Sequence, residues 1–357
     1  MNEQATSSRA PRRPDGALLQ VGGRYGLLIL LVAVLVTFSV WIPDSFFAWD
    51  NFRATFALQA IILMVAFGVM LPLVVNEFDL SVGANAGFAS VLCVGLSVLQ
   101  QMPAWVCLTV PVVVSTLIGF INGLLVTKLK VMSFVATLGT ATAITGVGLW
   151  YTNLSEVRGA AADLTTIGRT QIGGLTLSVI VAAVVAVVLV VVLQYLPVGR
   201  RLLAIGANRE AARLTGITAD RHIIGMFTAA GLVVGIGGTL YGAALGAASN
   251  TTGNTLLLPA FAGAFLGSTA IFPGRFNVPG TVIGVFLLAF TVSGLEQVGV
   301  AVWIESVVTG FALVVSVAIS SWAIRARTAK LREAQLLSLA AKHEDAEKPS
   351  GEARGKV

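Results

Sequence analysis

Apolar residues dominate the chain in long uninterrupted runs, and short polar segments between them carry nearly all the charge. Eight stretches contain no Asp, Glu, Lys or Arg: 25–43, 54–76, 80–127, 131–155, 170–199, 222–274, 276–295 and 306–324. A helix that spans a bilayer needs about 20 apolar residues. Six stretches therefore fit one spanning helix each, and the two longest, of 48 and 53 residues, fit two helices each.

Polar clusters divide the two longest runs. The first run is interrupted at 100–103, which reads QQMP, and the second at 249–254, which reads SNTTGN. Such clusters mark turns. The pattern predicts an all-α polytopic membrane protein of about ten helices, with a potential inverted repeat of helices 2–5 and 7–10. A barrel is excluded because the runs do not alternate in segments of about ten residues.

The distribution of positive charge tests this count. With the N-terminus in the cytoplasm, ten helices place 20 of the 23 Lys and Arg residues in inner segments and leave Arg53, Arg158 and Arg169 outside. Cytoplasmic loops are enriched in Lys and Arg. Adding or removing one helix would place the later loops on the wrong side, so both termini are expected in the cytoplasm of a multi-pass membrane protein.

The chain divides into a membrane domain and two polar ends. Residues 1–25 are expected to form a cytoplasmic tail, followed by a first helix that is retained and not cleaved as a signal peptide. Residues 26–324 form the transmembrane domain, which includes a cytoplasmic loop at 197–221. Residues 325–357 are expected to begin as a helix and to end in a disordered charged tail.

Composition removes several other classes of protein. Hydrophobic residues make up 56% of the chain and charged residues only 11%, against about 25% charged in a soluble domain. The net charge of +6 lies in loops, which suits a membrane surface and gives no reason to expect nucleic-acid binding. Cys93 and Cys107 fall at different depths of apolar spans, so neither a disulfide nor a metal site is expected. No arrangement of nucleophile and base suggests an enzyme.

Glycine recurs at helical spacing in one later span, at 231, 235, 238, 242 and 246. Small residues let helix backbones approach closely in lipid. The stripe could serve packing alone, or it could also let helices slide past one another during gating.

Two acids lie between the second and third predicted helices. Glu77 and Asp79 are placed by the topology at an inner turn that water can reach. Asp79 precedes Leu80 and Ser81, which suits a helix start with the carboxylate near the positive end of the helix dipole. The alternative is a direct role in transport or gating, since ionisable groups at membrane depth are usually functional.

The inner loop at 197–221 is the longest polar interruption between middle spans. Asn208 can cap a helix and Gly216 can end it, which predicts a helix of about two turns and roughly 10 Å over 209–215. Such a helix could dock on a cytoplasmic partner. The loop could equally rest on anionic lipid headgroups, to which its five Arg residues are suited.

Four segments in order resemble one protein family. They read NEFDLSVGANAG (76–87), NGLLVTKLKVMSFVATLGT (122–140), GRRLLAIGANREAARLTGI (199–217) and FLGSTAIFPGRFNVPGTVIG (265–284). Together they resemble the permeases of ATP-binding-cassette importers, in the ribose-type branch of binding-protein-dependent sugar transport. The chain departs from the family pattern, which usually has glycine or proline, at Asn76, Glu77, Met132, Ser133, Ala207, Pro273 and Phe276.

The resemblance implies a multi-pass protein of the bacterial inner membrane and a division of labour between subunits. Two copies, or this chain and a similar permease, would form one pore, and an extracytoplasmic solute-binding protein would deliver the substrate. ATP and magnesium would bind only to a partner ATPase, because this chain has no phosphate-binding loop and is expected to bind no cofactor itself. The residues that would couple to the ATPase are Asn208, Arg209, Glu210, Ala211, Ala212, Arg213, Leu214 and Gly216.

Other functions remain as alternatives at this point. An ion-coupled secondary transporter could also use an inverted repeat, and a non-transporting scaffold is a third interpretation. Six residues are candidates for the transport pathway or its gate: Asn76, Asp79, Ser81, Phe134, Tyr241 and Asn250. Trp150, Tyr151 and Asn153 could add aromatic and amide partners for a sugar, although such residues also serve as interfacial anchors or packing residues.

Overall fold

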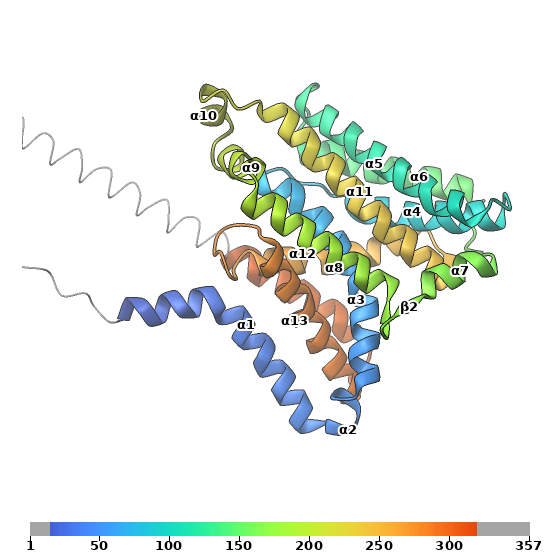
Figure 1. The fold of residues 1–357 in the computed structure, drawn as a ribbon, viewed down its shortest axis with the longest axis horizontal. Coiled ribbons are helices and arrows are strands. Elements are labelled where there is room, and N and C mark those ends of the chain that lie inside the picture. Colours follow the sequence, from blue (N-terminus) through green and yellow to red (C-terminus); the bar gives the residue numbers. More distant parts are fainter. Residues whose placement is uncertain (1–14, 320–357) are drawn as a thin grey trace, which may run out of the picture.

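The structure, a computed structural model, describes the backbone of residues 15–319 and the side chains of residues 24–319. Nearly all of this region is helical (Figure 1). The long helices are α1 (Asp15–Trp41), α3 (Trp49–Val74), α4 (Ser81–Val98), α5 (Ala104–Thr127), α6 (Ser133–Tyr151), α8 (Leu177–Val190), α11 (Ala219–Leu245), α12 (Thr252–Gly267), α13 (Val278–Gln297) and a last helix, Trp303–Ile319.

These ten apolar helices match the ten that the hydrophobic pattern predicts within the described region. Eight of them are long and apolar enough to cross a membrane, α8 being counted with the π-helical segment that extends it to Tyr195, and the last helix is shorter. α12 has 16 residues. Helices end and restart at both predicted turns, between α4 and α5 and between α11 and α12. The all-α polytopic fold is therefore confirmed.

The first helix begins earlier than expected, although its membrane-spanning part starts at Arg24, close to the expected position. α1 begins at Asp15 and not near residue 26, because the polar residues before the apolar stretch continue the same helix. The predicted helix and tail at 325–357 lie outside the described residues.

Several short elements were not expected from the sequence. α2 (Pro43–Phe46) and α7 (Ala162–Arg169) are single or double turns, a π-helical segment η1 (Val191–Tyr195) ends α8, and α9 (Pro197–Ala207) precedes α10 (Arg209–Leu214). Four two-residue strands form two antiparallel pairs: β1 (Val157–Arg158) with β4 (Ala247–Ala248), and β2 (Gln171–Ile172) with β3 (Leu175–Thr176).

α11 is the central helix, and it packs against α3, α4 and α5 (Figure 1). Its glycine stripe makes these contacts. A Cβ atom on Gly231 would meet the Ser115 carbonyl oxygen of α5, and one on Gly238 would meet the Ala86 carbonyl oxygen of α4. Since main-chain atoms cannot move aside, only glycine lets these helices approach so closely. The stripe therefore serves packing; whether the helices also slide stays a prediction.

The two ends of α11 carry different sets of charges. α10 lies near its start and α7 near its end (Figure 1). Arg169 in α7 donates to the Ala244 carbonyl at the end of α11 at 2.7 Å, and Arg53 donates to Gln171 at 2.6 Å. Two of the three predicted outer arginines thus lie near one another, away from α10, as the charge distribution requires. We call the end with α10 the inner end.

α4 and α12 meet at their first turns. A Cβ atom on Gly83 of α4 would lie 2.6 Å from the Gly253 carbonyl oxygen, and one on Gly253 of α12 would lie 2.5 Å from the Gly83 carbonyl oxygen. These are the second helices of the two proposed repeats. A reciprocal contact is what an internal two-fold relation would produce, so it agrees with the inverted repeat, which stays a prediction.

The two cysteines need one correction. Cys93 and Cys107 are free and fully buried, but they share one apolar cluster with Leu164 and Ala243 and do not lie at different depths. The helices α4 and α5 are joined by a short turn, so their neighbouring ends bring the two thiols to the same level.

Candidate functional site

α10 is a short capped helix at the inner end. The Asn208 side-chain oxygen accepts a hydrogen bond from the Ala211 amide at 3.0 Å, which caps the helix. Gly216, two residues beyond the helix, has φ +82°, a left-handed conformation that favours glycine. The predicted helix, its cap and its end are confirmed.

One face of α10 is turned to the protein and the other to its surroundings. Ala212 is buried against the bundle, whereas the Leu214 side chain is 91% exposed. Glu210 and Ala211 are also exposed. An apolar side chain that protrudes beside a charged one on a rigid, capped turn is suited to contact with another protein.

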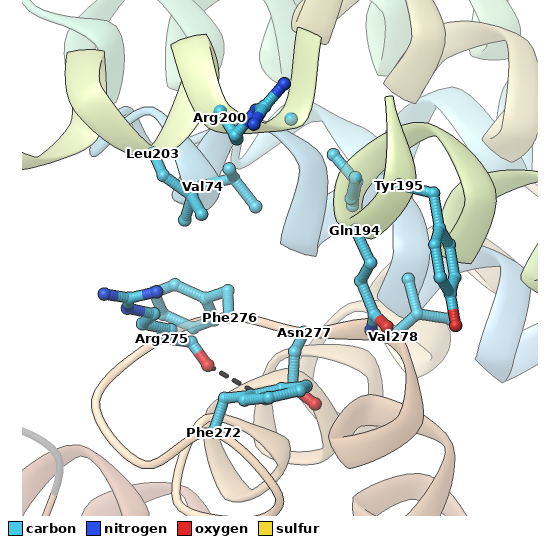
Figure 2. Close-up of a pocket in the computed structure, with 12 residues that line it drawn as sticks. Val74, Gln194, Tyr195, Arg200, Leu203, Phe272, Arg275, Phe276, Asn277 and Val278 are labelled. Atoms are coloured by element: carbon cyan, nitrogen blue, oxygen red, sulfur yellow. Dashed lines mark hydrogen bonds between the residues drawn. The ribbon is translucent and has the colours of Figure 1, made fainter. Parts of the chain in front are cut away.

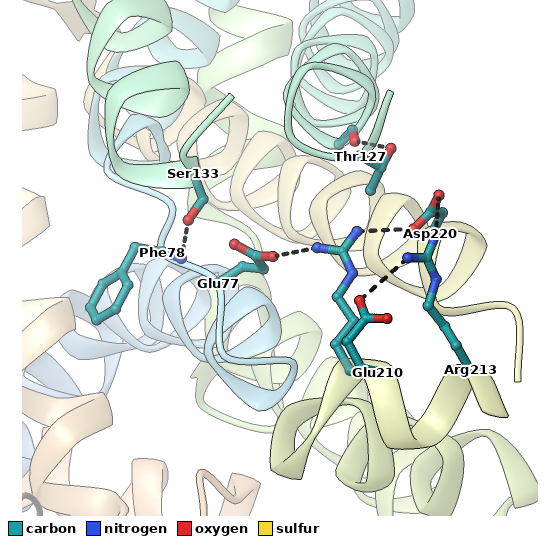
Figure 3. Close-up of polar contacts among 9 residues, drawn as sticks. Glu77, Phe78, Thr127, Ser133, Glu210, Arg213 and Asp220 are labelled. Carbon is teal, nitrogen blue, oxygen red and sulfur yellow. Dashed lines mark hydrogen bonds and ion pairs between the residues drawn. The ribbon is translucent and has the colours of Figure 1, made fainter. Parts of the chain in front are cut away.

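Arg209 ties α10 to two other segments. Its guanidinium lies 3.3 Å from Glu77 Oε1, between α3 and α4, and 2.9 Å from Asp220 Oδ1 in α11. Arg213 lies 3.4 Å from Glu210 and 3.7 Å from Asp220. Figure 3 shows Glu77 and Asp220 on either side of these contacts. The two ion pairs of Arg209 are partly shielded from water, so they are screened less than surface pairs, whereas the pair of Arg213 with Glu210 is exposed.

These side chains border a cavity of about 380 Å³ that also includes Lys130 and Ser133 at the α5–α6 turn. We call it the coupling cavity. Three carboxylates, those of Glu77, Glu210 and Asp220, balance the positive charges around it. A displacement of α10 would therefore change the contacts of α11, of the α3–α4 connection and of the start of α6.

Asp79 starts α4. Its Oδ1 atom accepts hydrogen bonds from the Ser81 amide at 2.8 Å and from the Ser81 hydroxyl at 2.6 Å. This supports the helix-start interpretation of Asp79. The expectation that water reaches Asp79 is wrong, since this residue is only 3% exposed. Helices α5 and α6 cover the connection between α3 and α4 and so bury it. Burial raises the pKa of the Asp79 carboxyl from 3.8 to about 6, against the lowering effect of the Ser81 hydrogen bonds.

A chain of hydrogen bonds runs from Asp79 into two neighbouring helices. The Asn122 amide of α5 donates to the Ser81 hydroxyl at 2.8 Å, and the Thr140 hydroxyl of α6 donates to Asn122 Oδ1 at 2.7 Å. The Leu80 amide donates to the Thr137 hydroxyl of α6 at 3.0 Å. The connection beside Glu77 is thus held to α5 and α6 by polar contacts that lack competition from bulk water.

The remaining pathway candidates are not brought together. Phe134 is exposed near the start of α6, close to the Asp79 connection. Asn250 lies at the opposite end of α6, where its amide donates to Thr152 at 2.8 Å. Phe134 and Gly148, which Asn250 also contacts, are 14 residues apart, or about 21 Å along a helix. Asn76 is exposed, with φ +61°, and Tyr241 packs against the main core.

Sequence reasoning missed part of the site. Asn122, Thr137, Thr140 and Asp220 were not identified as candidates. Asn122 and the two threonines are polar groups inside predicted spans, and such groups usually face the protein interior and find partners there. The spacing of Thr137 and Thr140, three residues apart on one face of α6, was the signal in the sequence that could have identified them. Nothing in the sequence pointed to the pairing of Asp220 with Arg209, which depends on how α10 folds back.

Comparison with known proteins agrees with the resemblance in the four segments. The family model described as the permease component of the branched-chain amino acid transport system matches residues 51–317. The ribose import permease protein of Bacillus subtilis (strain 168) is 32% identical over 305 residues, which cover 85% of this chain and 93% of that protein.

Two further relatives are similar over comparable lengths. The D-allose transport system permease protein of Escherichia coli is 27% identical, over 83% of this chain and 91% of its own. The galactose/methyl galactoside import permease protein of Haemophilus influenzae is 28% identical, over 85% and 95%. No solved structure matches significantly.

The family match covers most of the chain, and the multi-pass helical fold is the one that such a membrane subunit requires. The chain therefore belongs to this family of transport-system permeases, in the branch of ribose-type sugar importers powered by ATP-binding-cassette subunits.

Proposed function

We propose that this chain is the membrane-spanning subunit of a binding-protein-dependent importer that carries a monosaccharide or a related small polar solute. The observation that carries the proposal is α10, an exposed capped helix at the inner end whose Arg209 is ion-paired to the connection before α4. A secondary transporter has no need for a docking helix of this kind, and the similar proteins are named as import permeases.

The exposed face of α10 receives the ATPase subunit. When the ATPase changes shape, it moves α10, and Arg209 transmits the displacement to Glu77 and Asp220. The hydrogen bonds of Asp79, Ser81 and Asn122 pass it on to α5 and α6. The ATPase thereby biases a helix bundle between two arrangements through contacts that differ between them.

The partners follow from this role. The ATPase subunit binds ATP and magnesium. An extracytoplasmic solute-binding protein delivers substrate at the opposite end, where α7 and the paired strands β1 and β4 cover the helix ends. Two copies of this chain, or this chain and a similar permease, enclose the pathway.

A monosaccharide fits the chemistry that the relatives share, because their names specify ribose, allose and galactose. Which of these the chain carries is decided by uptake of a labelled panel into proteoliposomes that contain the permease, its ATPase and its binding protein.

The docking role is tested with charge reversal on α10. Glu210→Arg and Leu214→Glu are each expected to abolish ATP-driven uptake while the protein still inserts and folds, because both side chains are exposed. Leu129→Glu is the matched control, since Leu129 is 68% exposed at the inner end but lies outside α10. Unaltered uptake in the α10 variants would exclude it as the docking element, and uptake without ATP or partners would favour a secondary transporter.

A further inference from the structure

A second cavity at the inner end has a different character. It has a volume of about 340 Å³ and lies where η1 and α9 face the loop between α12 and α13. Figure 2 shows Arg200, Leu203 and Val74 on one side, Phe272, Arg275 and Phe276 across from them, and Gln194 and Tyr195 on a third side. We call it the headgroup cavity.

Its charge is positive and unbalanced. Arg200 and Arg275 come from segments far apart in sequence and line opposite walls. Neither guanidinium has an ion-pair or hydrogen-bond partner among residues 24–319, and no lining residue is Asp or Glu. A third arginine, Arg24, lies with its guanidinium 5.9 Å from the centre of the Phe272 ring. Positive charges of this kind attract an anion.

The loop that carries Arg275 is held in place by the side chain of Asn277. The buried Asn277 side chain donates to the carbonyl oxygens of Gly267, Ala270 and Arg275 at 3.0–3.2 Å and accepts from the Gly280 amide at 2.8 Å. These hydrogen bonds use the donors and the acceptor of the Asn277 side chain, so this residue holds the loop in shape. Contact with a ligand is left to the arginines.

The cavity lies at the boundary between membrane and cytoplasm. Arg200 lies five residues beyond the end of the spanning segment Leu177–Tyr195, and the exposed Tyr195 at that end is the kind of residue that marks the interface. Apolar residues, Leu193 and Val278 among them, also line the cavity, and the spanning segment that leads to it exposes four valines, Val184, Val187 and Val188 of α8 and Val191 of η1.

We propose that the headgroup cavity binds an anionic phospholipid of the inner leaflet. Arg200 and Arg275 contact the phosphate, the cavity takes the headgroup and glycerol, and the acyl chains lie along the exposed valines of α8 and η1. Basic pockets between membrane helices on the cytoplasmic side suit this class of ligand. A soluble anion would use the arginines but would have no use for the apolar wall.

The proposal is tested with full-length protein and two lipids of equal acyl chains, phosphatidylglycerol and phosphatidylcholine, counted as bound molecules by native mass spectrometry. The wild type is expected to bind phosphatidylglycerol at least tenfold more tightly. The variant R200Q/R275Q is expected to lose most of this preference without a change in melting temperature, since both side chains are exposed.

R201Q/R221Q is the matched control. It removes the same charge from exposed inner-end positions that do not line the cavity, and it is expected to keep the preference. Equal loss in both variants would mean that overall charge and not this cavity selects the lipid, and full retention in R200Q/R275Q would also overturn the proposal. Displacement of phosphatidylglycerol by free glycerol phosphate at similar concentration would assign the cavity to a soluble anion instead.

Discussion

The coupling cavity and the headgroup cavity lie at the same end of the molecule, and each is bordered by at least one arginine from the loop between α8 and α11. In the coupling cavity, Glu77, Glu210 and Asp220 accompany Arg209 and Arg213. In the headgroup cavity, Arg200 and Arg275 have no acidic companion among the described residues.

This difference separates two uses of the same side chain. An arginine with carboxylates at both ends of its guanidinium links protein segments, because the charge is satisfied within the chain. An arginine that faces a cavity without carboxylates is available to a ligand. On the two proposals made above, the loop between α8 and α11 would contact two partners, the ATPase subunit through α10 and an anionic lipid through the start of α9.

The largest effect on transport is expected from reversing one charge of the coupling cavity. Glu77→Arg would place a positive charge against Arg209 and is expected to reduce ATP-driven uptake at least tenfold. The swapped pair, Glu77→Arg with Arg209→Glu, is expected to recover part of it, since opposite charges face each other again. Uptake by reconstituted permease, ATPase and binding protein measures both.

The control for this experiment is Arg201→Glu, an exposed charge on α9 outside both cavities. It is expected to transport as the wild type does. If Glu77→Arg transported normally, or if the swap gave no recovery beyond the single variants, the link between Arg209 and Glu77 would not carry the coupling.

Asp79 is a third case beside the two cavities, because its carboxylate is hydrogen-bonded to a hydroxyl and an amide group and has no arginine partner among the described residues. Its raised pKa, about 6 against 3.8, means that ionisation disfavours the folded state. Stability from this group is complete below pH 4 and is lost as the pH rises through 6. The difference amounts to about 3 kcal/mol. Asp79→Asn keeps an acceptor for Ser81, so it is expected to melt higher than the wild type at pH 7.5 and equally at pH 4.

Uptake distinguishes the two interpretations of Asp79. If it only starts α4, Asp79→Asn is expected to transport within twofold of the wild type. A loss of tenfold or more with an unchanged melting temperature would show a direct role in transport.

A smaller effect is expected where α9 joins the two cavities. A Cβ atom on Gly206 would collide with the Val74 carbonyl oxygen at the end of α3. Gly206→Ala is expected to destabilise the protein by about 1–3 kcal/mol, since a main-chain atom cannot yield without a shift of the helix. Gly225→Ala is the control, because no atom lies within 4 Å of that position. Thermal unfolding measures both, and equal melting temperatures would mean that α9 adjusts freely.

The helices could be predicted from the sequence because the bilayer imposes a length on each apolar run. Both turns inside the long runs were found, and α10 was found with its cap at Asn208, since these features depend on neighbours in sequence. α9 was missed because its basic and apolar residues suit either a loop at the membrane surface or a helix.

The site was only partly predictable. Glu77, Asp79 and Arg209 were identified because charged residues are rare in this chain, but their partners come from other helices. The pairing of Arg209 with Asp220 and of Asn122 with Ser81 depends on how α5, α10 and α11 pack, which no local pattern specifies. The contact of Cys93 with the cluster around Cys107 escaped for the same reason.

The most direct test of the account is the accessibility of α10. Leu214→Cys places one reactive thiol on the exposed face, and the native Cys93 and Cys107 are fully buried. A membrane-impermeant maleimide is expected to label this variant in inside-out vesicles and not in right-side-out vesicles, and added ATPase subunit is expected to protect it. Labelling from the outer face, or labelling that the ATPase leaves unchanged, would contradict the assignment of α10 as the docking helix.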